Sequence, residues 1–298
     1  MKNDPFWDFY WETHLQYMQG QGKGEVIEKA SQLIRTSKQP FRILEAGCGE
    51  AQIIGSLVEA HGSPGDEQAS VGIDRDLTAL AVARKKYPSI RFLVGDFTDT
   101  DLLHSLGRFD LLLLVNALHH VFSDAYDPKL GEIDVPKGKA NLHTSFGNLS
   151  QTVKPGGYVI LFDGLEMNAS PDTPVQIQFQ TPEAMEKFQT FAREYQPFRV
   201  QFHQDSADKV TLSMRDFTRY VTKIIFLGKP LWERERQESY QYFTEAEMRE
   251  MFNRNGFDIQ EFRLLSVDYD HWLQEVSILS PDVDFPPEHV LITAQKSG

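Results

Sequence analysis

The stretch ILEAGCGE, residues 43–50, decides the fold of this chain. A short apolar run ends at the acidic Glu45, and the turn Gly47-Cys48-Gly49 follows it. The apolar run predicts a buried strand, and the two glycines allow a sharp turn in which the backbone can approach a ligand closely. A helix that begins after such a turn points its electropositive N-terminus at the same ligand. The stretch therefore predicts a strand, a binding loop and a helix, in that order.

The rest of the chain repeats this alternation of strand and helix. Short apolar runs with few internal charges, typical of strands buried on both faces, are separated by amphipathic helical segments. The runs occupy residues 41–46, 70–74, 90–95, 109–115 and 158–163, and two last strands are expected at 257–264 and 289–295. Capping residues predict that helices begin at Asp76, Thr181, Ser213 and Thr244. The alternation predicts an α/β fold with a doubly wound, mostly parallel sheet.

Two segments fall outside the alternation. Residues 1–39 carry an aromatic stripe at helical spacing, which predicts an N-terminal helical lid. Residues 165–242 contain two amphipathic helical patterns, which predict an inserted helical substrate cap. The α/β domain would then comprise residues 40–164 and 243–298.

Composition narrows the class of partner. The formal net charge is −13, with 41% hydrophobic and 24% charged residues, as is typical of a soluble globular protein. This acidic balance argues against a nucleic-acid partner, because phosphate contacts require a basic face. No apolar run reaches the roughly 20 residues that span a bilayer, and the first residues do not resemble a signal peptide. Cys48 is the only cysteine, so no intrachain disulfide is expected, and a cytoplasmic location fits.

Acidic residues follow the second and third runs. Asp74 ends the second run, and Asp96 with Phe97 follows the third. A carboxylate at the end of a parallel strand can accept hydrogen bonds from a bound nucleoside. The alternative is that either residue only caps the next helix. A dinucleotide site needs a third glycine where this chain has Gln52, which argues against a nicotinamide-dependent oxidoreductase.

The order of these motifs resembles the class I S-adenosylmethionine-dependent methyltransferases, and in particular their small-molecule branch. The resemblance covers about residues 40–163 and the last two strands, which look like that family's closing antiparallel pair. It implies a Rossmann-like, seven-stranded sheet, S-adenosyl-L-methionine as the cofactor and a small-molecule acceptor. The alternative is a protein that binds S-adenosylmethionine or S-adenosylhomocysteine without catalysis.

The resemblance also implies roles for single residues. Asp74 would accept the ribose hydroxyls, Asp96 and Phe97 would hold adenine, and Asn116 would face the methionine end. The implied cofactor-binding set is Glu45, Gly47, Cys48, Gly49, Asp74, Arg75, Asp96, Phe97 and Asn116. One departure is Ala51, where many members of the family have another glycine.

Two histidines are the candidates for catalysis. His119 and His120 follow the fourth strand, and a histidine can act as a general base near neutral pH. Asp163 ends the fifth strand and would orient one of them, as in similar enzymes. Alternatively, one histidine packs in the core and the other bonds locally. No recognisable metal-ligand spacing accompanies them.

Aromatic and basic residues are the candidates for contacts with the acceptor. We expect lid or substrate contacts from Trp7, Tyr10, Trp11 and Tyr220, although these rings could equally serve as packing. Arg215, Arg219 and Lys223 recur at helical spacing in the insertion. They would hold an anionic substrate or, alternatively, form a solvated face that pairs with acidic side chains.

Overall fold

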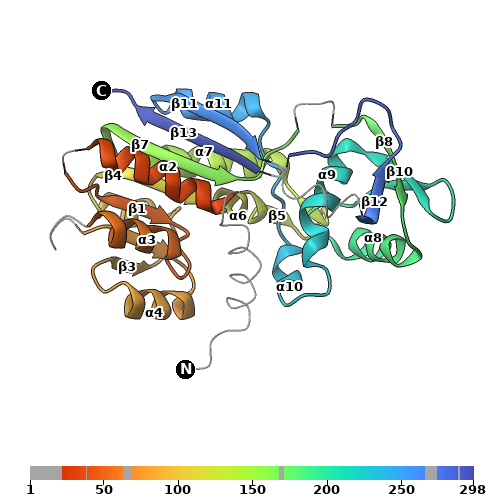
Figure 1. The fold of residues 1–298 in the computed structure, drawn as a ribbon, viewed down its shortest axis with the longest axis horizontal. Coiled ribbons are helices and arrows are strands. Elements are labelled where there is room, and N and C mark those ends of the chain that lie inside the picture. The colour runs from red at the N-terminus through yellow and green to blue at the C-terminus, as the bar shows by residue number, and fades with distance from the viewer. Residues whose placement is uncertain (1–21, 38, 63–68, 168–170, 266–273, 288) are drawn as a thin grey trace.

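The computed structural model describes residues 22–37, 39–62, 69–167, 171–265, 274–287 and 289–298. A seven-stranded sheet organises the chain, with the strand order β11-β13-β7-β4-β1-β2-β3 (Figure 1). Its strands are β1 (Ile43–Ala46), β2 (Val71–Asp74), β3 (Arg91–Val94), β4 (Phe109–Val115), β7 (Val153–Asp163), β11 (Phe257–Leu265) and β13 (His289–Lys296). Only β13 runs antiparallel to its neighbours, β7 and β11. The predicted mostly parallel seven-stranded sheet is therefore confirmed.

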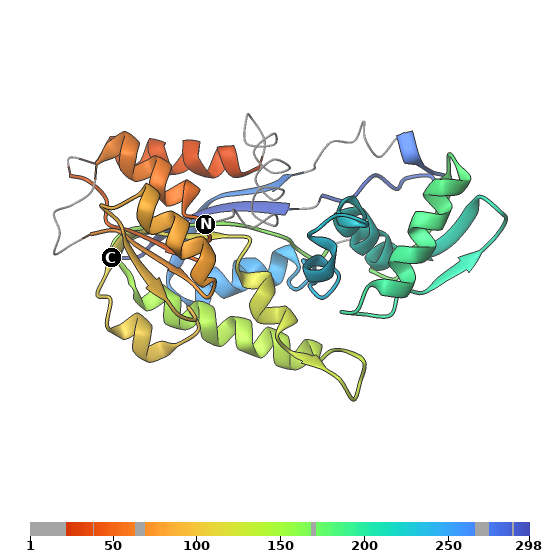
Figure 2. The same ribbon diagram turned by 90° about the horizontal axis from the view of Figure 1, so that it is seen from below.

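Helices cover both faces of this sheet. They are α2 (Lys23–Thr36), α3 (Gln52–His61), α4 (Leu77–Lys86), α5 (Thr100–His104), α6 (Leu118–Ser123), α7 (Val135–Gln151) and α11 (Glu245–Arg254). Figure 2 shows α2, in red, on one side of the sheet and the long yellow-green α7 on the other. A short hairpin of β5 (Tyr126–Asp127) and β6 (Glu132–Ile133) joins α6 to α7.

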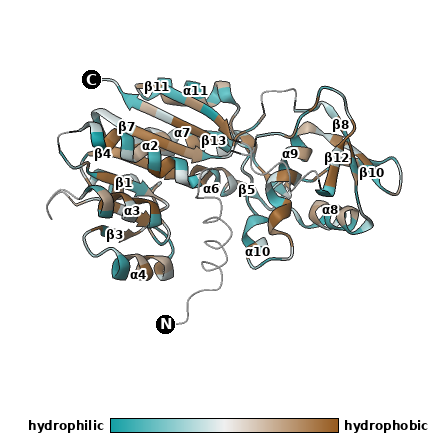
Figure 3. Cartoon of the chain, viewed as in Figure 1, coloured by the Kyte–Doolittle hydropathy of each residue, from teal (hydrophilic) through white to brown (hydrophobic). Residues whose placement is uncertain are grey.

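The central strand explains why the sheet needs two helical layers. In β4, Leu111, Leu113 and Val115 join one buried hydrophobic cluster, with α2 and α3, while Leu112 and Leu114 join a second cluster with α7 and α11. Successive side chains of a strand point to opposite faces, so a continuous apolar run must be covered on both sides. The central strands are accordingly brown along their length in Figure 3.

The insertion contains both helices and strands. It consists of β8 (Pro174–Phe179), α8 (Pro182–Glu194), β9 (Phe202–Gln204), β10 (Lys209–Ser213), α9 (Met214–Lys223), the 3-10 turn η2 (Ile224–Phe226) and α10 (Trp232–Glu235). The strands form an antiparallel sheet in the order β12-β8-β10-β9, completed by β12 (Val276–Ile278). The expectation of a helical cap at 165–242 is thus corrected, because this segment contains three strands as well as helices. Its bounds are corrected too, because β12, from within 243–298, belongs to the same sheet.

Local capping signals were reliable guides to where helices begin. Asp76, Thr181, Ser213 and Thr244 each cap the expected helix through the side chain, and Thr244 forms a capping box with Glu247. Each cap satisfies backbone N–H groups that have no partner within the helix. Within the described residues, no helix is both long and apolar enough to cross a membrane.

Aromatic side chains fill the core of the insertion. Tyr220 is fully buried, with ring centroids 5.1 Å from Phe188 and 5.6 Å from Phe191. This placement corrects the expectation that Tyr220 contacts substrate, because it lies among the core side chains of the insertion rather than at the cavity described below.

Two basic residues of α9 pair with acidic side chains, as one of the two alternatives expected, but they are buried rather than on a solvated face. Lys223 is fully buried with its Nζ 2.6 Å from Glu235, and Arg219 donates to Asp216 at 2.9 Å. Both cations are therefore paired with acidic side chains inside the insertion, as buried charges must be, rather than with a substrate.

Candidate functional site

The loop after β1 forms one wall of the site. Gly47 and Gly49 have φ angles of 78° and 51°, and Ala51 also adopts a left-handed conformation, with φ 60°. A Cβ at position 47 would lie 3.0 Å from the Cβ of Ala117, which is closer than side chains normally approach. The backbone therefore requires glycine at position 47. Ala51, where many members of the resembled family have glycine, adopts the left-handed conformation without glycine.

Asp74 ties this loop to the second strand. Its Oδ2 accepts a hydrogen bond from the Gly49 N–H at 2.7 Å, and its Oδ1 accepts one from the Asp76 N–H at 2.8 Å. A carboxylate has about four lone-pair directions, so Asp74 retains acceptor capacity toward a ligand. The side chain lines the cavity, as expected from the sequence.

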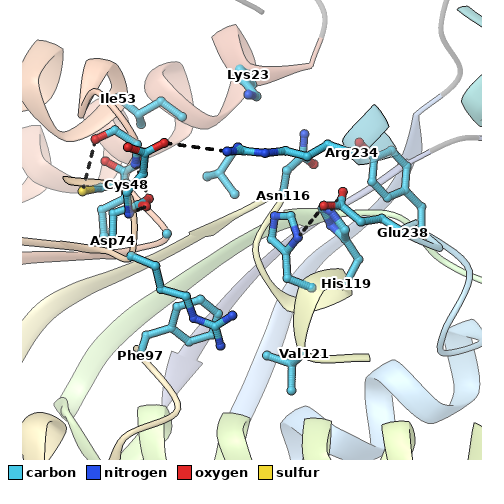
Figure 4. Close-up of a pocket in the computed structure, with 18 of the residues that line it drawn as sticks. Lys23, Cys48, Ile53, Asp74, Phe97, Asn116, His119, Val121, Arg234 and Glu238 are labelled. Carbon is cyan, nitrogen blue, oxygen red and sulfur yellow. Dashed lines mark hydrogen bonds and ion pairs between the residues drawn. The ribbon is translucent and has the colours of Figure 1, made fainter. Parts of the chain in front are cut away.

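A cavity of about 500 Å³ lies beyond the carboxyl ends of β1, β2 and β4. The loop side contributes Cys48, Asp74 and Phe97, and the insertion contributes Arg234 and Glu238 across from them (Figure 4). Arg234 lies 3.9 Å from Asp76, so the insertion contacts the edge of the α/β domain here. Ligands of open α/β sheets bind at this end of the strands, and the cavity has the size of a small-molecule site.

Asp96 does not line this cavity, in contrast to Arg75 and Phe97. Its Oδ1 accepts a hydrogen bond from the Thr98 N–H at 2.8 Å, and its Oδ2 is ion-paired with Arg75. Arg75 also pairs with Asp124 at 3.2 Å. The Asp96 carboxylate is therefore screened from the cavity by the Arg75 guanidinium, and a direct contact with adenine requires Arg75 to move aside.

A buried acid and a buried amine lie next to each other at the cavity wall. Glu45 accepts a hydrogen bond from the Ile54 N–H at 3.1 Å, at the start of α3, and burial raises its pKa to about 8. Burial lowers the pKa of Lys23, at the start of α2, to about 7. Each group favours the other's charged form, but the loss of water outweighs this attraction.

Asn116 presents a buried acceptor to the cavity. Its backbone has a left-handed φ of 49°, and its N–H donates a hydrogen bond to the Phe162 carbonyl at 2.7 Å. Its side-chain Oδ1 is buried and has no hydrogen-bond partner among the described residues. Leaving a buried acceptor unsatisfied costs about 1–3 kcal/mol, so this atom is suited to accept a donor from a ligand.

Asp163 holds the helix that carries both histidines. Its Oδ2 accepts hydrogen bonds from the backbone N–H groups of Ala117 and Leu118 at 3.1 and 2.8 Å, and its Oδ1 accepts one from Nδ1 of His119 at 2.8 Å. Asp163 is fully buried and does not line the cavity. It therefore acts through His119 and α6, as a positioning residue.

His119 lies between two carboxylates. Its Nδ1 bonds to Asp163, while its Nε2 is 3.5 Å from Glu238. Burial lowers the pKa of His119, but Asp163 and Glu238 raise it further, to about 9. The two carboxylates thus favour the protonated ring, whereas a general base must start neutral, so a catalytic role for His119 stays a prediction. His120 is more open, with 45% of its side chain exposed.

Several residues that line the cavity were not assigned to it from the sequence, among them Lys23, Glu238 and Tyr240. The last two come from the end of the insertion, 118 or more residues from His120 along the chain, and no spacing signal links them to it. The predicted lid residues Trp7, Tyr10 and Trp11 lie outside the described residues.

Comparisons with known proteins agree with the fold. Residues 43–134 match a protein-family model described as "Methyltransferase domain". A solved S-adenosylmethionine-dependent methyltransferase from Clostridium acetobutylicum is similar, with a TM-score of 0.52 and 11% identity over 99% of this chain and 100% of that one. This identity relates the folds alone.

Two more solved structures show weaker similarity. One is an S-adenosylmethionine-dependent methyltransferase from Mesorhizobium loti, with a TM-score of 0.49 and 16% identity over 92% of this chain and 100% of that one. The other is an O-methyltransferase family protein from Burkholderia thailandensis, with a TM-score of 0.46 and 11% identity over 93% of this chain but 56% of that one. No curated protein matches the sequence.

Proposed function

We propose that the chain binds S-adenosylmethionine in the cavity and methylates a small-molecule acceptor there. The match of residues 43–134 to a methyltransferase domain supports this proposal. The observation that carries the proposal is the position of Asp74. Its carboxylate lies at the end of β2, is held by the Gly49 N–H of the glycine loop, and faces the cavity.

The residues present suit the cofactor. Asp74 would accept the ribose hydroxyls, and Phe97 would pack against adenine with Arg75 beside it. The unpartnered Oδ1 of Asn116 would accept a hydrogen bond from the ammonium group of the methionine end. Gly47 keeps the loop close to Ala117, in a space that a Cβ would fill.

Bound S-adenosylmethionine supplies a methyl group that its sulfonium makes electrophilic. The chain's own residues would then have to orient an acceptor and exclude water. We define the acceptor end of the cavity as His119, His120, Glu238 and Tyr240, which all line it. Figure 4 shows His119 and Glu238 on the side of Asn116 that lies away from Asp74. Of the two histidines, His120 would receive a proton from the acceptor, because its side chain is open whereas His119 is buried and hydrogen-bonded to Asp163.

A small acceptor fits the shape and charge of the site. The segment 234–240 of the insertion lies across the sheet end, so the cavity is walled by two parts of the chain. The net charge of −13 argues against a polyanionic substrate such as nucleic acid.

Calorimetric titration of the full chain with S-adenosylmethionine and S-adenosylhomocysteine tests the proposal. We expect Asp74→Asn to weaken binding by about tenfold to a hundredfold, because hydrogen bonds to a charged group are lost. Asp101→Asn, which changes an exposed carboxylate away from the cavity, should bind like the unchanged protein. If the folded native chain binds neither compound, the proposal is wrong. If it binds both but transfers no methyl group to any acceptor, it is instead a non-catalytic binding protein.

A further inference from the structure

Two imidazoles and a carboxylate converge at the acceptor end of the cavity. Nδ1 of His120 is 3.2 Å from one oxygen of Glu238, and Nε2 of His119 is 3.5 Å from the other. One ligand atom from each of the three residues lies within 4.8 Å of the others. Figure 4 shows the Glu238 carboxylate close to His119.

These separations suit a common metal ion. Zn²⁺ is bound by histidine nitrogens at about 2.0–2.1 Å and by carboxylate oxygens at about 2.0–2.2 Å. Two such ligands around a tetrahedral ion are therefore about 3.3 Å apart. The distances from Glu238 oxygens to Nδ1 of His120 and Nε2 of His119 are 3.2 and 3.5 Å, on either side of that value. Small side-chain movements therefore suffice for the three residues to bind one ion.

The hydrogen bond behind His119 favours the same role. Asp163 accepts a hydrogen bond from Nδ1 of His119 at 2.8 Å, which turns Nε2 toward Glu238. Metal-bound histidines almost always donate their other N–H to a carboxylate, carbonyl or water, which fixes the ring and makes it a stronger ligand. Because Asp163 is also held by the backbone of α6, the ring is oriented before any ligand arrives.

The charges around the cluster can be balanced by a divalent cation. Asp163 and Glu238 are two carboxylates facing the two imidazoles. The nearby Lys223 pairs with Glu235 at 2.6 Å, and burial lowers the pKa of His289 to about 4, which leaves it neutral. Tyr240 packs its ring 4.3 Å from that of His119. The two negative charges therefore attract either protons on the imidazoles or one ion of charge +2 in their place.

We propose that His119, His120 and Glu238 bind one divalent transition-metal ion, with Zn²⁺ as the best-matched ion. A set of two imidazoles and one carboxylate suits Zn²⁺, whereas Mg²⁺ prefers oxygen ligands alone. Three protein ligands leave at least one coordination position open, and the cluster lines the cavity. In the methyltransferase proposed above, an ion there would lower the pKa of an acceptor hydroxyl; this consequence rests on that function, whereas binding of the ion does not.

The test is a titration of the chelator-treated full chain with ZnCl₂, in the absence of S-adenosylmethionine. We expect one equivalent to bind at pH 7.5, with MgCl₂ giving no such binding. Zn²⁺ binding should weaken as the pH falls, because protons compete with the ion for histidine nitrogens, and it should release any proton that the ion displaces. Titrations in two buffers of different ionisation enthalpy measure this release.

Variants separate the cluster from adventitious surface binding. Glu238→Gln and His120→Ala should each weaken Zn²⁺ binding by at least about tenfold. His203→Ala is the matched control, because that side chain is 81% exposed and lies outside the cluster. The visible absorption of Co²⁺ bound in place of Zn²⁺ should disappear in Glu238→Gln. Circular dichroism confirms that each variant is folded.

Two outcomes overturn the inference: the absence of a one-equivalent site, or equal affinity in the native chain and both cluster variants. Either is distinguishable from failure of the proposed function. A chain that binds S-adenosylmethionine but not Zn²⁺ refutes the metal site alone, and one that binds Zn²⁺ but not the cofactor refutes the methyltransferase proposal alone.

Discussion

The Oδ1 of Asp163 accepts a hydrogen bond from Nδ1 of His119 across 2.8 Å, in a region where neither side chain is more than 2% exposed. The other oxygen of the same carboxylate caps α6 by accepting hydrogen bonds from three backbone N–H groups. One residue at the end of β7 thus fixes both the helix after β4 and the histidine on it. This hydrogen bond therefore links the carboxyl ends of β4 and β7.

Replacing Asp163 with Asn should destabilise the protein. The charge on the acceptor is lost, and one of the oxygens becomes an amide that donates instead of accepting. Hydrogen bonds to charged groups contribute about 1.5–3 kcal/mol, so we expect the free energy of unfolding in urea to fall by a similar amount. Asp101→Asn, at an exposed position, should change it by less than about 0.5 kcal/mol. Equal effects of the two substitutions would show that the Asp163 bonds contribute little.

The pKa of His119 predicts a pH dependence of stability. Burial lowers this pKa and the two carboxylates raise it, so that it moves from 6.5 to about 9 in the folded chain. The folded state therefore binds the proton more tightly than the unfolded state does. The resulting stabilisation is fully present below pH 6.5 and is lost as the pH rises through 9, and it amounts to about 3 kcal/mol.

The measurement compares unfolding of the native chain and of His119→Gln at several pH values. Burial also shifts Lys23 and Glu45, with pKa values near 7 and 8, so only the difference between the two proteins reports on His119. We expect the stability advantage of the native chain to shrink between pH 6.5 and 9. A difference that stays constant across this range would contradict the raised pKa.

A methyl group at Gly47 should impair both stability and cofactor binding. Gly47→Ala places a side chain in the left-handed region and brings its Cβ to 3.0 Å from Ala117. The left-handed backbone costs about 1–2 kcal/mol, and overpacking adds about 1–3 kcal/mol. Gly131 has a similar φ of 72° with nothing within 4 Å, so Gly131→Ala isolates the backbone cost.

We expect Gly131→Ala to lower the free energy of unfolding without changing S-adenosylmethionine binding. Gly47→Ala should lower the free energy of unfolding further and weaken S-adenosylmethionine binding at least about tenfold. That factor corresponds to about 1.4 kcal/mol of binding free energy. Calorimetric titration and urea unfolding of the two variants provide the comparison. Identical behaviour would mean that the loop yields easily at position 47.

The core position of Tyr220 predicts a large loss of stability without a change in binding. Tyr220→Ala removes a fully buried ring from among Phe179, Phe188 and Phe191, and such truncations cost about 3–5 kcal/mol. The exposed Tyr126 is the matched control, and Tyr126→Ala should cost less than about 0.5 kcal/mol. Thermal unfolding and cofactor titration of the folded fraction measure the two effects. Weaker cofactor binding by folded Tyr220→Ala would restore a role at the site for this ring.

Sequence patterning alone was enough for the architecture of the α/β domain. The apolar runs, the loop at residues 43–50 and the caps at Asp76 and Thr244 all predicted elements that the structure contains. These signals are local, because a buried parallel strand, a glycine turn and a helix cap each depend on neighbouring residues. The prediction of a methyltransferase family is confirmed by the family match over residues 43–134.

Contacts between distant segments decided the rest. The pairing of β12 with β8 joins residues 276–278 to 177–179, and this long-range pairing was not expected when the insertion was predicted to be helical. Likewise, Glu238 meets His119 and His120 only because the end of the insertion folds back over the sheet. Local sequence spacing does not reveal a contact between such distant segments. The ionisation of His119 depends on this contact. The sequence by itself therefore determined the scaffold and the cofactor loop, while tertiary folding decided what surrounds the acceptor end, because charge and burial there come from three separate parts of the chain.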